Sequence, residues 1–388
     1  MSSPLKILQM VHTLDPSVGG VATSVLALSR ALTRHGYKID ILVLEEPSAS
    51  WIEGVALNVH ALGSGQTSYR YSRALQPWLR QHGGSYDRVI VNGMWQYLSF
   101  AAWRRYAGSS IPYYVFPHGM LDPWFKKTFP LKHLKKWLYW PWAEYRVLRD
   151  AAAVIFTSEE ERLLARKSFW LYRARERVSS LGVEAPPILP NAKSEFLSRY
   201  PQLQNTRNLL FLGRLHPKKG CDILLEALAR IRSNDPISLI MAGPDQIGWE
   251  KDLRRQVERL NLTSQVIFTG MLQGGMKQGA FASADAFVLP SHQENFGISV
   301  VEALAAGVPV LISNRVNIWR EIDADHAGYV ESDNVEGTTR LLQRWVDTPP
   351  DQREPIRQNA RNCFERRFEI DRAANSLVQI LNEPRTAQ

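Results

Sequence analysis

The feature that most restricts the fold of this chain is an alternation of short apolar stretches with segments of helical periodicity, which occurs twice. Residues 6–11 are predicted as a strand, and apolar residues at helical spacing follow as far as residue 32. A second series of the same kind begins at residues 208–212. Strands that alternate with helices form parallel sheets with helices on both faces. The sequence therefore predicts an α/β protein with two doubly wound, Rossmann-like domains.

Further strands are expected at intervals along both series, with helical stretches between most of them. In the first series they are predicted at residues 39–44, 57–62, 88–91, 113–116 and 153–156. In the second series they are predicted at residues 237–241, 266–269, 286–289 and 308–312. After residue 333 helices are predicted at 335–346, 352–368 and 370–381. The chain is thus expected to end in a helical tail.

The length of the chain, 388 residues, exceeds what one ordinary core accommodates, so two domains are expected. Hydrophobic residues make up 45% of the sequence, which is enough for two cores. A proline-rich stretch at residues 184–191 is predicted to connect them. In doubly wound sheets ligands bind at the carboxyl ends of the strands. A ligand site is therefore predicted at these ends, in a cleft between the domains.

Several classes of protein are disfavoured by what the sequence lacks. The two cysteines, Cys221 and Cys363, lie in different halves, so a reducing compartment is favoured over a disulfide framework. The sequence contains no run of 18 consecutive apolar residues, so no membrane span is predicted. Asp323 and Asp325 have no third ligand nearby and are expected to be solvated. Neither a zinc cluster nor a nucleotide-hydrolase loop is present, so no metal or cofactor is predicted.

The most informative motif lies between residues 290 and 303. A short apolar strand ends at Pro290, a polar loop follows, and helical periodicity begins at Gly297. Glu294 on the loop and Glu302 in the helix stand eight residues apart, and the free backbone N–H groups of Phe296, Gly297 and Ile298 lie between them. A helix N-terminus attracts anions, and carboxylates bind hydroxyl groups. This combination suits a sugar diphosphate.

Two loops that follow strands could approach a phosphate. Gly19 and Gly20 enter the first helix and leave the backbone unobstructed, although the same pair could be a simple turn. In the second series Arg214, Lys218 and Lys219 crowd the end of a strand. Arginine offers a fork for phosphate oxygens and lysine a point charge. A solvated basic loop is the alternative, but the position at a strand end favours phosphate binding.

A single histidine, His118, follows the predicted strand 113–116. An isolated histidine is more often structural than functional. Its position at the carboxyl end of a strand of the first domain places it on the ligand-binding edge of that sheet. The side chain is therefore predicted to hydrogen-bond a sugar hydroxyl or an acceptor.

Together these segments resemble glycosyltransferase family 4, the retaining transferases with the GT-B architecture, over nearly the whole chain. The resemblance rests on the glycine loop, on Gly213-Arg214 with Lys219-Gly220, and on the two glutamates. It implies an acceptor-side domain at residues 1–184 and a nucleotide-sugar donor domain at residues 185–368. It also implies a terminal helix, residues 369–388, that returns to the first domain.

The resemblance further implies the roles of the site residues. Arg214 and Lys219 would neutralise the departing nucleotide diphosphate, and Glu302 would hold the ribose. Glu294 would bind the transferred sugar, which His118 would also contact. The remaining donor-binding residues would be Gly19, Gly20, Gly213, Phe296, Gly297 and Ile298. Fixed cations stabilise the leaving group without a metal. Retention would follow from same-face attack, with a covalent Glu294 intermediate as the alternative.

One segment of the first half is both basic and aromatic. Residues 124–149 contain seven lysines and arginines against one glutamate, interleaved with aromatic residues. Lysines that reach lipid phosphates and aromatic rings that settle at the interface are typical of membrane docking. The alternative is that the rings pack in the core, and no module predicts nucleic-acid binding. The predicted docking residues are Trp124, Lys126, Lys127, Lys132, Lys135, Lys136 and Trp137.

The predicted function is transfer of a hexose from a UDP- or GDP-sugar to a hydroxyl of a lipid-linked or oligosaccharide acceptor. The pathway would be cell-envelope, exopolysaccharide or lipopolysaccharide biosynthesis, at the cytoplasmic face of the membrane. Acceptor choice is expected to depend on the loops at residues 64–71 and 94–97. Two other functions fit the same residues: a nucleotide-sugar epimerase, or a non-catalytic module that binds sugar nucleotides or membranes.

Overall fold

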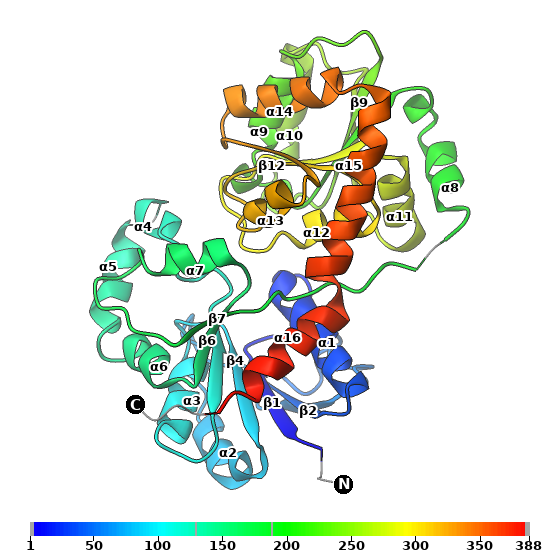
Figure 1. Cartoon of the computed structure of the whole chain (residues 1–388). Coiled ribbons are helices and arrows are strands. Elements are labelled where there is room, and N and C mark those ends of the chain that lie inside the picture. Colours follow the sequence, from blue (N-terminus) through cyan, green and yellow to red (C-terminus); the bar gives the residue numbers. More distant parts are fainter. Residues whose placement is uncertain (1–3, 129, 188, 385–388) are drawn as a thin grey trace. The chain divides into compact units, whose positions relative to one another are not determined.

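The computed structural model describes residues 4–128, 130–187 and 189–384 (Figure 1). The chain divides into two compact units, which are described separately below. Unit 1 comprises Met1–Glu184 together with Glu369–Gln388, and unit 2 comprises Ala185–Phe368. The end of the chain therefore belongs to the same unit as its beginning.

The sheet of unit 1 has seven parallel strands in the order β3-β2-β1-β4-β5-β6-β7. The order reverses between β1 and β4, where doubly wound sheets bind ligands. Leu8 in β1 lies opposite Asp40 of β2 on one side and Val89 of β4 on the other. The strands are β1 (Lys6–Val11), β2 (Lys38–Val43), β3 (Asn58–Ala61), β4 (Arg88–Asn92), β5 (Tyr113–Phe116), β6 (Ala153–Phe156) and β7 (Glu176–Val178).

Helices connect these strands and pack on the sheet. One apolar cluster contains Leu8 and Met10 of β1, and another contains Val11 with Val25 of the first helix. Successive residues of a strand point to opposite faces, so β1 contributes to both clusters. The helices are α1 (Gly20–Arg34), α2 (Leu75–His82), α3 (Tyr97–Tyr106), α4 (Trp124–Thr128), α5 (Pro130–Tyr139), α6 (Glu144–Asp150), α7 (Glu159–Ala165) and α16 (Ile370–Leu381).

The terminal helix α16 packs against α1, as the predicted fold class requires (Figure 1). Asp371 pairs with Arg34 of α1 at 3.1 Å, and the carbonyl of Leu381 accepts from Arg88 Nε at 2.9 Å. A Cβ on Gly182 would lie 2.7 Å from that of Ala373, closer than real contacts allow. Glycine is therefore needed where the chain leaves unit 1 beside α16.

Unit 2 contains a second parallel sheet, with six strands in the order β10-β9-β8-β11-β12-β13. Its strand order reverses between β8 and β11. The strands are β8 (Arg207–Leu212), β9 (Ile237–Ala242), β10 (Val266–Gly270), β11 (Ala286–Leu289), β12 (Val310–Ser313) and β13 (Gly328–Glu331). The helices are α8 (Ala192–Arg199), α9 (Cys221–Leu228), α10 (Glu250–Arg259), α11 (Gly274–Ser283), α12 (Ile298–Ala305), α13 (Trp319–Ala324), α14 (Val335–Asp347) and α15 (Pro350–Cys363).

The predicted fold class is confirmed, with differences at the edges of both sheets. Strands β7 and β13 were not predicted, because each is short and only partly buried, so its sequence is not a continuous apolar run. β12 begins at Val310 instead of residue 308 because Pro309 has no N–H for the ladder. The helix predicted at 352–368 ends at Cys363, and a π-helical turn, Phe364–Phe368, follows it.

The prediction that Asp325 is solvated is wrong. Its carboxylate is buried and accepts hydrogen bonds from Arg367 Nε and Nη2, both at 2.8 Å, and pairs with Arg366 at 3.0 Å. These hydrogen bonds hold the pKa of Asp325 below its usual value. The ion pair ties α13 to the π-helical turn. The charged residues beside Asp325 in the sequence suggested solvent, but its partners come from a distant segment of the chain.

This ion pair yields a test of unit 2 stability. We expect Asp325→Asn to lower the free energy of unfolding by about 2 kcal/mol at pH 7, because two guanidinium groups lose their anion while remaining partly solvated. The effect shrinks as the pH falls through the lowered pKa, where the native carboxylate is itself protonated. Chemical denaturation measures it. Exposed Asp323→Asn is the control, and an equal loss in that variant would contradict the assignment.

Candidate functional site

The carboxyl edge of the unit 2 sheet is built by close backbone contacts that only glycine permits. A Cβ on Gly243, after β9, would lie 1.8 Å from the carbonyl oxygen of Gly213, after β8. Gly220 has a left-handed φ of 70°, and a Cβ there would lie 2.3 Å from the carbonyl oxygen of Pro290. The loops after β8, β9 and β11 are therefore drawn together at one place.

Hydrogen bonds then connect the basic loop to the loop after β11. His216 Nδ1 accepts from the backbone N–H of Lys218 at 3.0 Å. The carbonyl of Lys218 accepts from Ser291 Oγ at 2.9 Å and from the backbone N–H of His292 at 2.8 Å. The two segments that the sequence analysis singled out separately therefore form one structure.

Glu294 is held by both its backbone and its side chain. Its N–H donates to the carbonyl of Arg315 at 2.9 Å, and its carbonyl accepts from Asn317 N–H at 2.9 Å. Its carboxylate forms an ion pair with Lys219. Burial raises the pKa of Glu294, but the charges of Lys219, Lys218 and Arg214 outweigh burial and lower it. The group is therefore an ionised acceptor of hydrogen bonds.

Glu302 lies in the second turn of α12 and has a partner that was not predicted. Lys277 of α11 donates to its carboxylate at 2.7 Å. No sequence signal marks Lys277, because the pair joins residues 25 positions apart on different helices. Gly297 caps α12 with a left-handed φ of 72°. In the described part of the chain, the N–H groups of Gly297 and Ile298 donate to no protein acceptor.

Two other predicted residues of unit 2 contribute differently. Arg214 is exposed and donates from Nη1 to Gln246 Oε1 at 3.3 Å, so its guanidinium remains open to a ligand. The ring of Phe296 is buried edge-on against Phe368, with ring centroids 5.8 Å apart. Only the backbone of Phe296 can therefore face a ligand. Arg214, Lys219, Glu294 and the start of α12 share this edge of the sheet.

A second unpredicted pair supports the same loop. His292 Nδ1 lies 3.0 Å from Asp333 Oδ2, and Arg315 Nε donates to Asp333 Oδ1 at 3.3 Å. Burial raises the pKa of Asp333, but these two partners lower it overall. The loop on which Glu294 stands is thus braced from both sides by charged groups.

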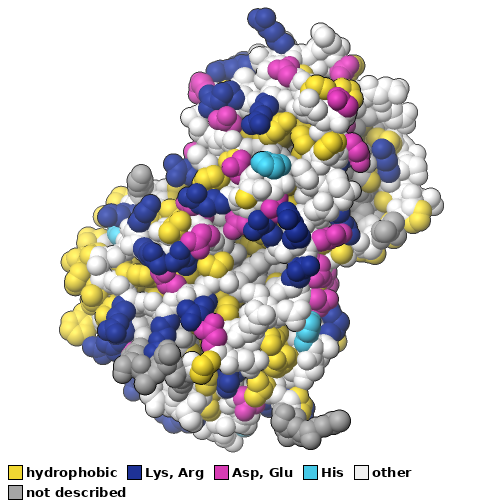
Figure 2. All heavy atoms as spheres, viewed as in Figure 1, with side chains coloured by type: hydrophobic (Ala, Val, Ile, Leu, Met, Phe, Trp, Pro, Cys, Tyr) yellow, Lys and Arg dark blue, Asp and Glu magenta, His cyan; other side chains and the backbone are white. Residues whose placement is uncertain are grey.

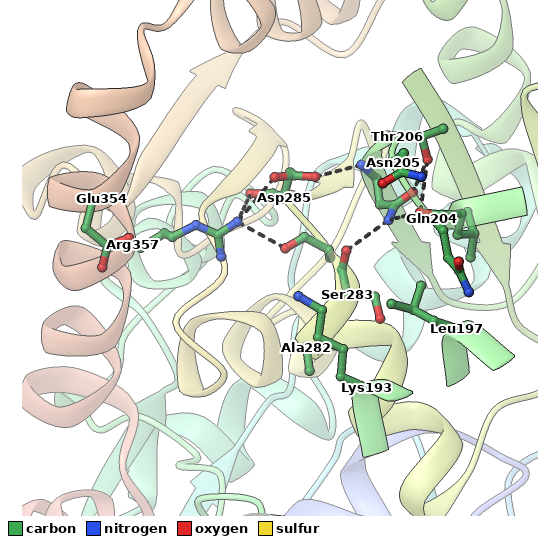
Figure 3. A pocket seen from close by; sticks show the side chains of 13 residues that line it. Lys193, Leu197, Gln204, Asn205, Thr206, Ala282, Ser283, Asp285, Glu354 and Arg357 are labelled. Carbon is green, nitrogen blue, oxygen red and sulfur yellow. Dashed lines mark hydrogen bonds and ion pairs between the residues drawn. The ribbon is translucent and has the colours of Figure 1, made fainter. Parts of the chain in front are cut away.

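A hollow in unit 2 lies at the opposite edge of the sheet (Figure 3). It includes Asn208 near the start of β8 and Asp285 just before β11. The carboxylate of Asp285 accepts from the backbone N–H of Asn208 at 2.8 Å and lies 3.5 Å from Arg357. These contacts stabilise the fold. Parallel sheets bind ligands at the carboxyl edge, which is the other edge of this sheet. Nor do three His, Cys, Asp or Glu side chains cluster as metal ligands anywhere in the described residues.

In unit 1 the glycine loop after β1 is fixed by a buried carboxylate. Glu45 accepts from the backbone N–H of Leu14 and from Trp51 Nε1, each at 2.8 Å, and from Thr13 Oγ1. Gly19 has φ 142° and ψ −174°, which essentially only glycine adopts. Helix α1 begins at Gly20 without a side-chain cap. The loop thus presents its backbone at the carboxyl edge of this sheet.

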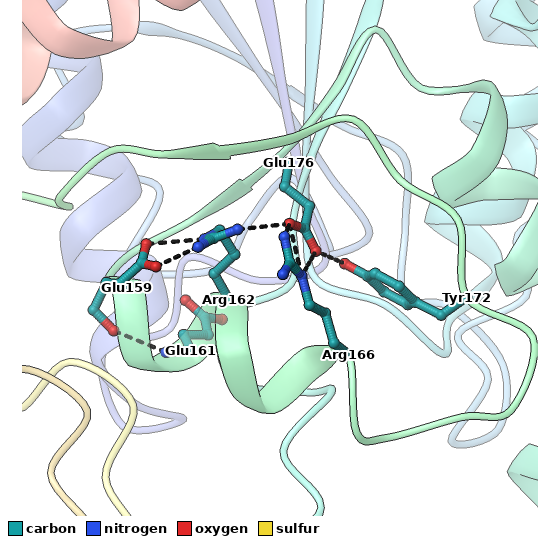
Figure 4. A network of polar contacts seen from close by, with 7 residues as sticks. Glu159, Glu161, Arg162, Arg166, Tyr172 and Glu176 are labelled. Carbon is teal, nitrogen blue, oxygen red and sulfur yellow. Dashed lines mark hydrogen bonds and ion pairs between the residues drawn. The ribbon is translucent and has the colours of Figure 1, made fainter.

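His118 occupies a turn that other residues hold in place. It has a left-handed φ of 50°, and the following N–H, of Gly119, donates to Glu161 Oε1 at 2.5 Å. Glu161 also accepts from Thr157 through its N–H, at 2.6 Å, and its hydroxyl, at 2.8 Å. Figure 4 shows Glu161 on α7 beside a network in which Arg162 and Arg166 both pair with Glu176. That network attaches α7 to β7.

The hydrogen bonds of Asn92 determine which nitrogen of His118 carries the proton. Asn92 Nδ2 donates to Gln9 Oε1 at 2.8 Å and to the carbonyl of Met10 at 3.4 Å. Its Oδ1 therefore faces His118 Nε2, 3.0 Å away, and accepts a hydrogen bond from the Nε2–H group. Nδ1 is left as a buried acceptor without a protein partner among the described residues. Burial lowers the pKa of His118 to about 3, so the ring is neutral.

Comparison with known proteins extends this description. Residues 194–363 match the family described as Glycosyl transferases group 1, and residues 19–182 match the Glycosyl transferase 4-like domain. Two Rossmann-like sheets of this kind define the GT-B class of sugar transferases. The chain belongs to the glycosyl transferases of group 1, and the predicted resemblance to family 4 is confirmed.

Individual relatives match over different lengths. A phosphatidyl-myo-inositol mannosyltransferase of Mycobacterium leprae is 34% identical over 40% of this chain and 42% of its own. The chain thus spans less than half the length of that relative. A GDP-mannose:cellobiosyl-diphosphopolyprenol alpha-mannosyltransferase of Komagataeibacter xylinus is 25% identical over 92% of this chain and 88% of its own. The Anabaena Alr3699/HepE structure with UDP matches with a TM-score of 0.79 and 19% identity, over 97% of this chain and 99% of its own.

The protonation state of His118 can be tested directly. We expect long-range proton–nitrogen NMR spectra to show the Nε2–H tautomer, with no titration between pH 5 and 8, because the folded site disfavours the charged ring. His118→Gln assigns the signal. A midpoint near the ordinary value of about 6.5 would contradict the neutral state assigned to the buried ring.

Proposed function

We propose that this protein is a retaining transferase that moves a hexose from a UDP- or GDP-sugar to a hydroxyl of a lipid-linked acceptor in envelope polysaccharide assembly. The observation that carries the proposal is the cluster of Arg214, Lys219, Glu294 and the start of α12 at the carboxyl edge of unit 2. In this proposal Arg214 and Lys219 hold the diphosphate, Glu294 holds the sugar and Glu302 the ribose.

The proposed roles follow from where charge develops. Breaking the anomeric C–O bond leaves an oxocarbenium-like sugar and a more negative diphosphate. Lys219 is half-buried, so its charge is screened less than that of a solvated lysine. Unbonded N–H groups at the start of α12 add a fixed dipole that requires no reorganisation. These groups supply the positive charge that the departing diphosphate requires.

The acceptor proton needs a base as the new glycosidic bond forms. With a pKa of about 3, His118 is a weak proton acceptor at neutral pH. In the proposed step the leaving phosphate oxygen takes the proton from the acceptor hydroxyl on the same face of the sugar. The anomeric carbon then exchanges one C–O bond for another with retention. His118 Nδ1 accepts a hydrogen bond from a hydroxyl and orients it.

Two observations support a lipid-linked acceptor. The names of two relatives specify lipid acceptors, phosphatidyl-myo-inositol and a diphosphopolyprenol. Helix α5 exposes an apolar face, over which Figure 2 shows hydrophobic side chains beside lysines and arginines. No helix among the described residues has the length and hydropathy of a membrane span. The exposed residues of this apolar patch are Leu131 at 80%, Leu134, Trp137, Leu138, Trp142 at 70% and Trp170.

The predicted docking residues divide by exposure. Lys126, Lys132 and Lys135 are exposed, and Trp137 is 44% exposed, as membrane docking requires. Trp124 and Lys136 are half-buried. The side chain of Lys127 lies outside what the structure describes. The proposed contact with anionic lipid therefore rests on the apolar patch and the exposed lysines.

The diphosphate assignment is tested by substitution in unit 2. We expect Arg214→Ala and Lys219→Ala each to lower donor turnover about 100-fold, the usual effect of removing one transition-state contact. Lys251→Ala, at an exposed site on α10, is the control. The assay follows UDP- and GDP-hexoses with and without polyprenyl-diphosphate glycans. Full activity in either variant would overturn the assignment.

The same assay separates the alternatives. A transferase consumes donor productively only with acceptor, an epimerase isomerises donor without it, and a binding module does neither. A shift in melting temperature with UDP or GDP reports nucleotide binding independently of turnover.

Membrane docking is tested by flotation with anionic vesicles. We expect the protein to float with them, and the double variant Leu131→Ser/Leu134→Ser to bind at least about tenfold more weakly, because two exposed leucines no longer enter the interface. Ile247→Ser changes an exposed apolar residue of unit 2 and is the control. Failure of the unmodified protein to float would rule out docking.

A further inference from the structure

The two loops that were expected to decide acceptor choice meet in the structure. The N–H of Tyr97 donates to the carbonyl of Tyr69 at 2.8 Å. The ring of Tyr97 lies 4.8 Å from that of Tyr71 and 5.9 Å from that of Tyr69, centroid to centroid. These loops follow β3 and β4, so the rings gather at the carboxyl edge of the unit 1 sheet.

Helix α5 completes this group with its inner face. The hydroxyl groups of Tyr139 and Tyr69 lie 2.6 Å apart, and Lys136 Nζ lies 4.5 Å from the ring centroid of Trp95. Lys136 and Tyr139 are three residues apart and share one face of the helix. Leu134 and Leu138 of the apolar patch lie on the outer face. One helix thus joins the aromatic group to the proposed membrane contact.

Two cations within this group have no carboxylate within salt-bridge distance among the described residues. Arg70 and Lys136 are half-buried, and neither forms an ion pair with any residue that the structure describes. The acid near Lys136 is Glu144, which is fully buried and accepts from Trp95 N–H at 2.7 Å and Ser99 Oγ at 3.0 Å. Burial raises the pKa of Glu144 to about 7 and lowers that of Lys136 to about 8, while the charge of each group opposes the shift of the other.

Arg70 lies close to the start of the glycine loop. Burial lowers the pKa of His12, the residue that follows β1, and the charge of Arg70 lowers it further. Arg70 also stands between Tyr69 and Tyr71 in the sequence, with a left-handed φ of 57°. A partly desolvated cation without a counter-ion gains most from an anionic ligand. The arrangement therefore suits a ligand that combines negative charge with flat or ringed apolar surface.

We propose that these residues, here called the aromatic platform, form the acceptor subsite and bind a glycan that carries a phosphate or diphosphate. The proposal rests on the proposed transferase function. Sugar CH groups pack on the negative faces of the rings, tyrosine hydroxyls bond sugar hydroxyls, and the cations bind phosphate oxygens. The platform consists of Tyr69, Arg70, Tyr71, Trp95, Tyr97, Lys136 and Tyr139.

The position of α5 explains how one acceptor could use both surfaces. Its outer face would rest on the membrane while its inner face contacts the headgroup. A lipid-linked glycan could then remain anchored while its sugar reaches the platform. A soluble sugar phosphate would satisfy the same contacts without the outer face, so the two sources are separated by experiment.

The test measures binding without turnover. In the full chain carrying Arg214→Ala and Lys219→Ala, which silences the proposed donor site, calorimetry follows glucose 1-phosphate, geranyl diphosphate and inorganic pyrophosphate. We expect Arg70→Gln and Lys136→Gln each to weaken binding of all three at least tenfold. Exposed Arg73→Gln and Lys167→Gln are matched controls that should not change it. Melting curves establish that each variant is folded.

Removal of a ring separates stacking from charge. We expect Tyr71→Ala, at a position 40% exposed, to weaken the binding of glucose 1-phosphate and to leave the binding of pyrophosphate unchanged. Tighter binding of geranyl diphosphate than of glucose 1-phosphate supports a lipid-linked acceptor, and the reverse supports a soluble one. Unchanged affinities in Arg70→Gln and Lys136→Gln, or equal losses in the controls, would overturn the platform. A failed transferase assay leaves this binding result intact, so the two proposals fail separately.

Discussion

The close packing of backbone at the carboxyl edge of the unit 2 sheet is the constraint on which the candidate site depends. Gly213 and Gly243 bring the ends of β8 and β9 into contact, and Gly220 lies against Pro290. No side chain fits between these segments. Because the backbone is fixed there, Lys219 and Glu294 meet although 75 residues separate them in the sequence. The positions of these two charged side chains therefore follow from the packing of the backbone.

Charge placement differs between the two units in a way that suits the proposed reaction. In unit 2 the carboxylates Glu294 and Glu302 each have a lysine partner, so a bound diphosphate would have to share those cations. In unit 1 neither Arg70 nor Lys136 forms a salt bridge with a described residue, although the charge of Glu144 acts on Lys136. His118 is kept neutral by burial, and Asn92 holds its proton on Nε2.

Much of the fold was predictable because periodicity and strand-end residues are local signals. Alternating apolar stretches predicted both sheets, and the positions of the glutamates, Arg214 and Lys219 after strands led to their proposal as site residues. Lys277, Asp333 and Asn92 were not recognised, since each acts through a partner on a distant element. The prediction that Asp325 is solvated was wrong for the same reason, because its arginine partners lie more than 40 residues further along the chain.

The sequence by itself determined the α/β class, the two series of strands and the chemical character of the loops, because these depend on local spacing and residue type. Only the tertiary structure decided which loops meet, which nitrogen of His118 carries the proton, and that Lys136 turns toward Trp95 while Lys132 and Lys135 face solvent. Burial and partner choice set those properties. Both arise when distant segments pack together, which no local pattern specifies.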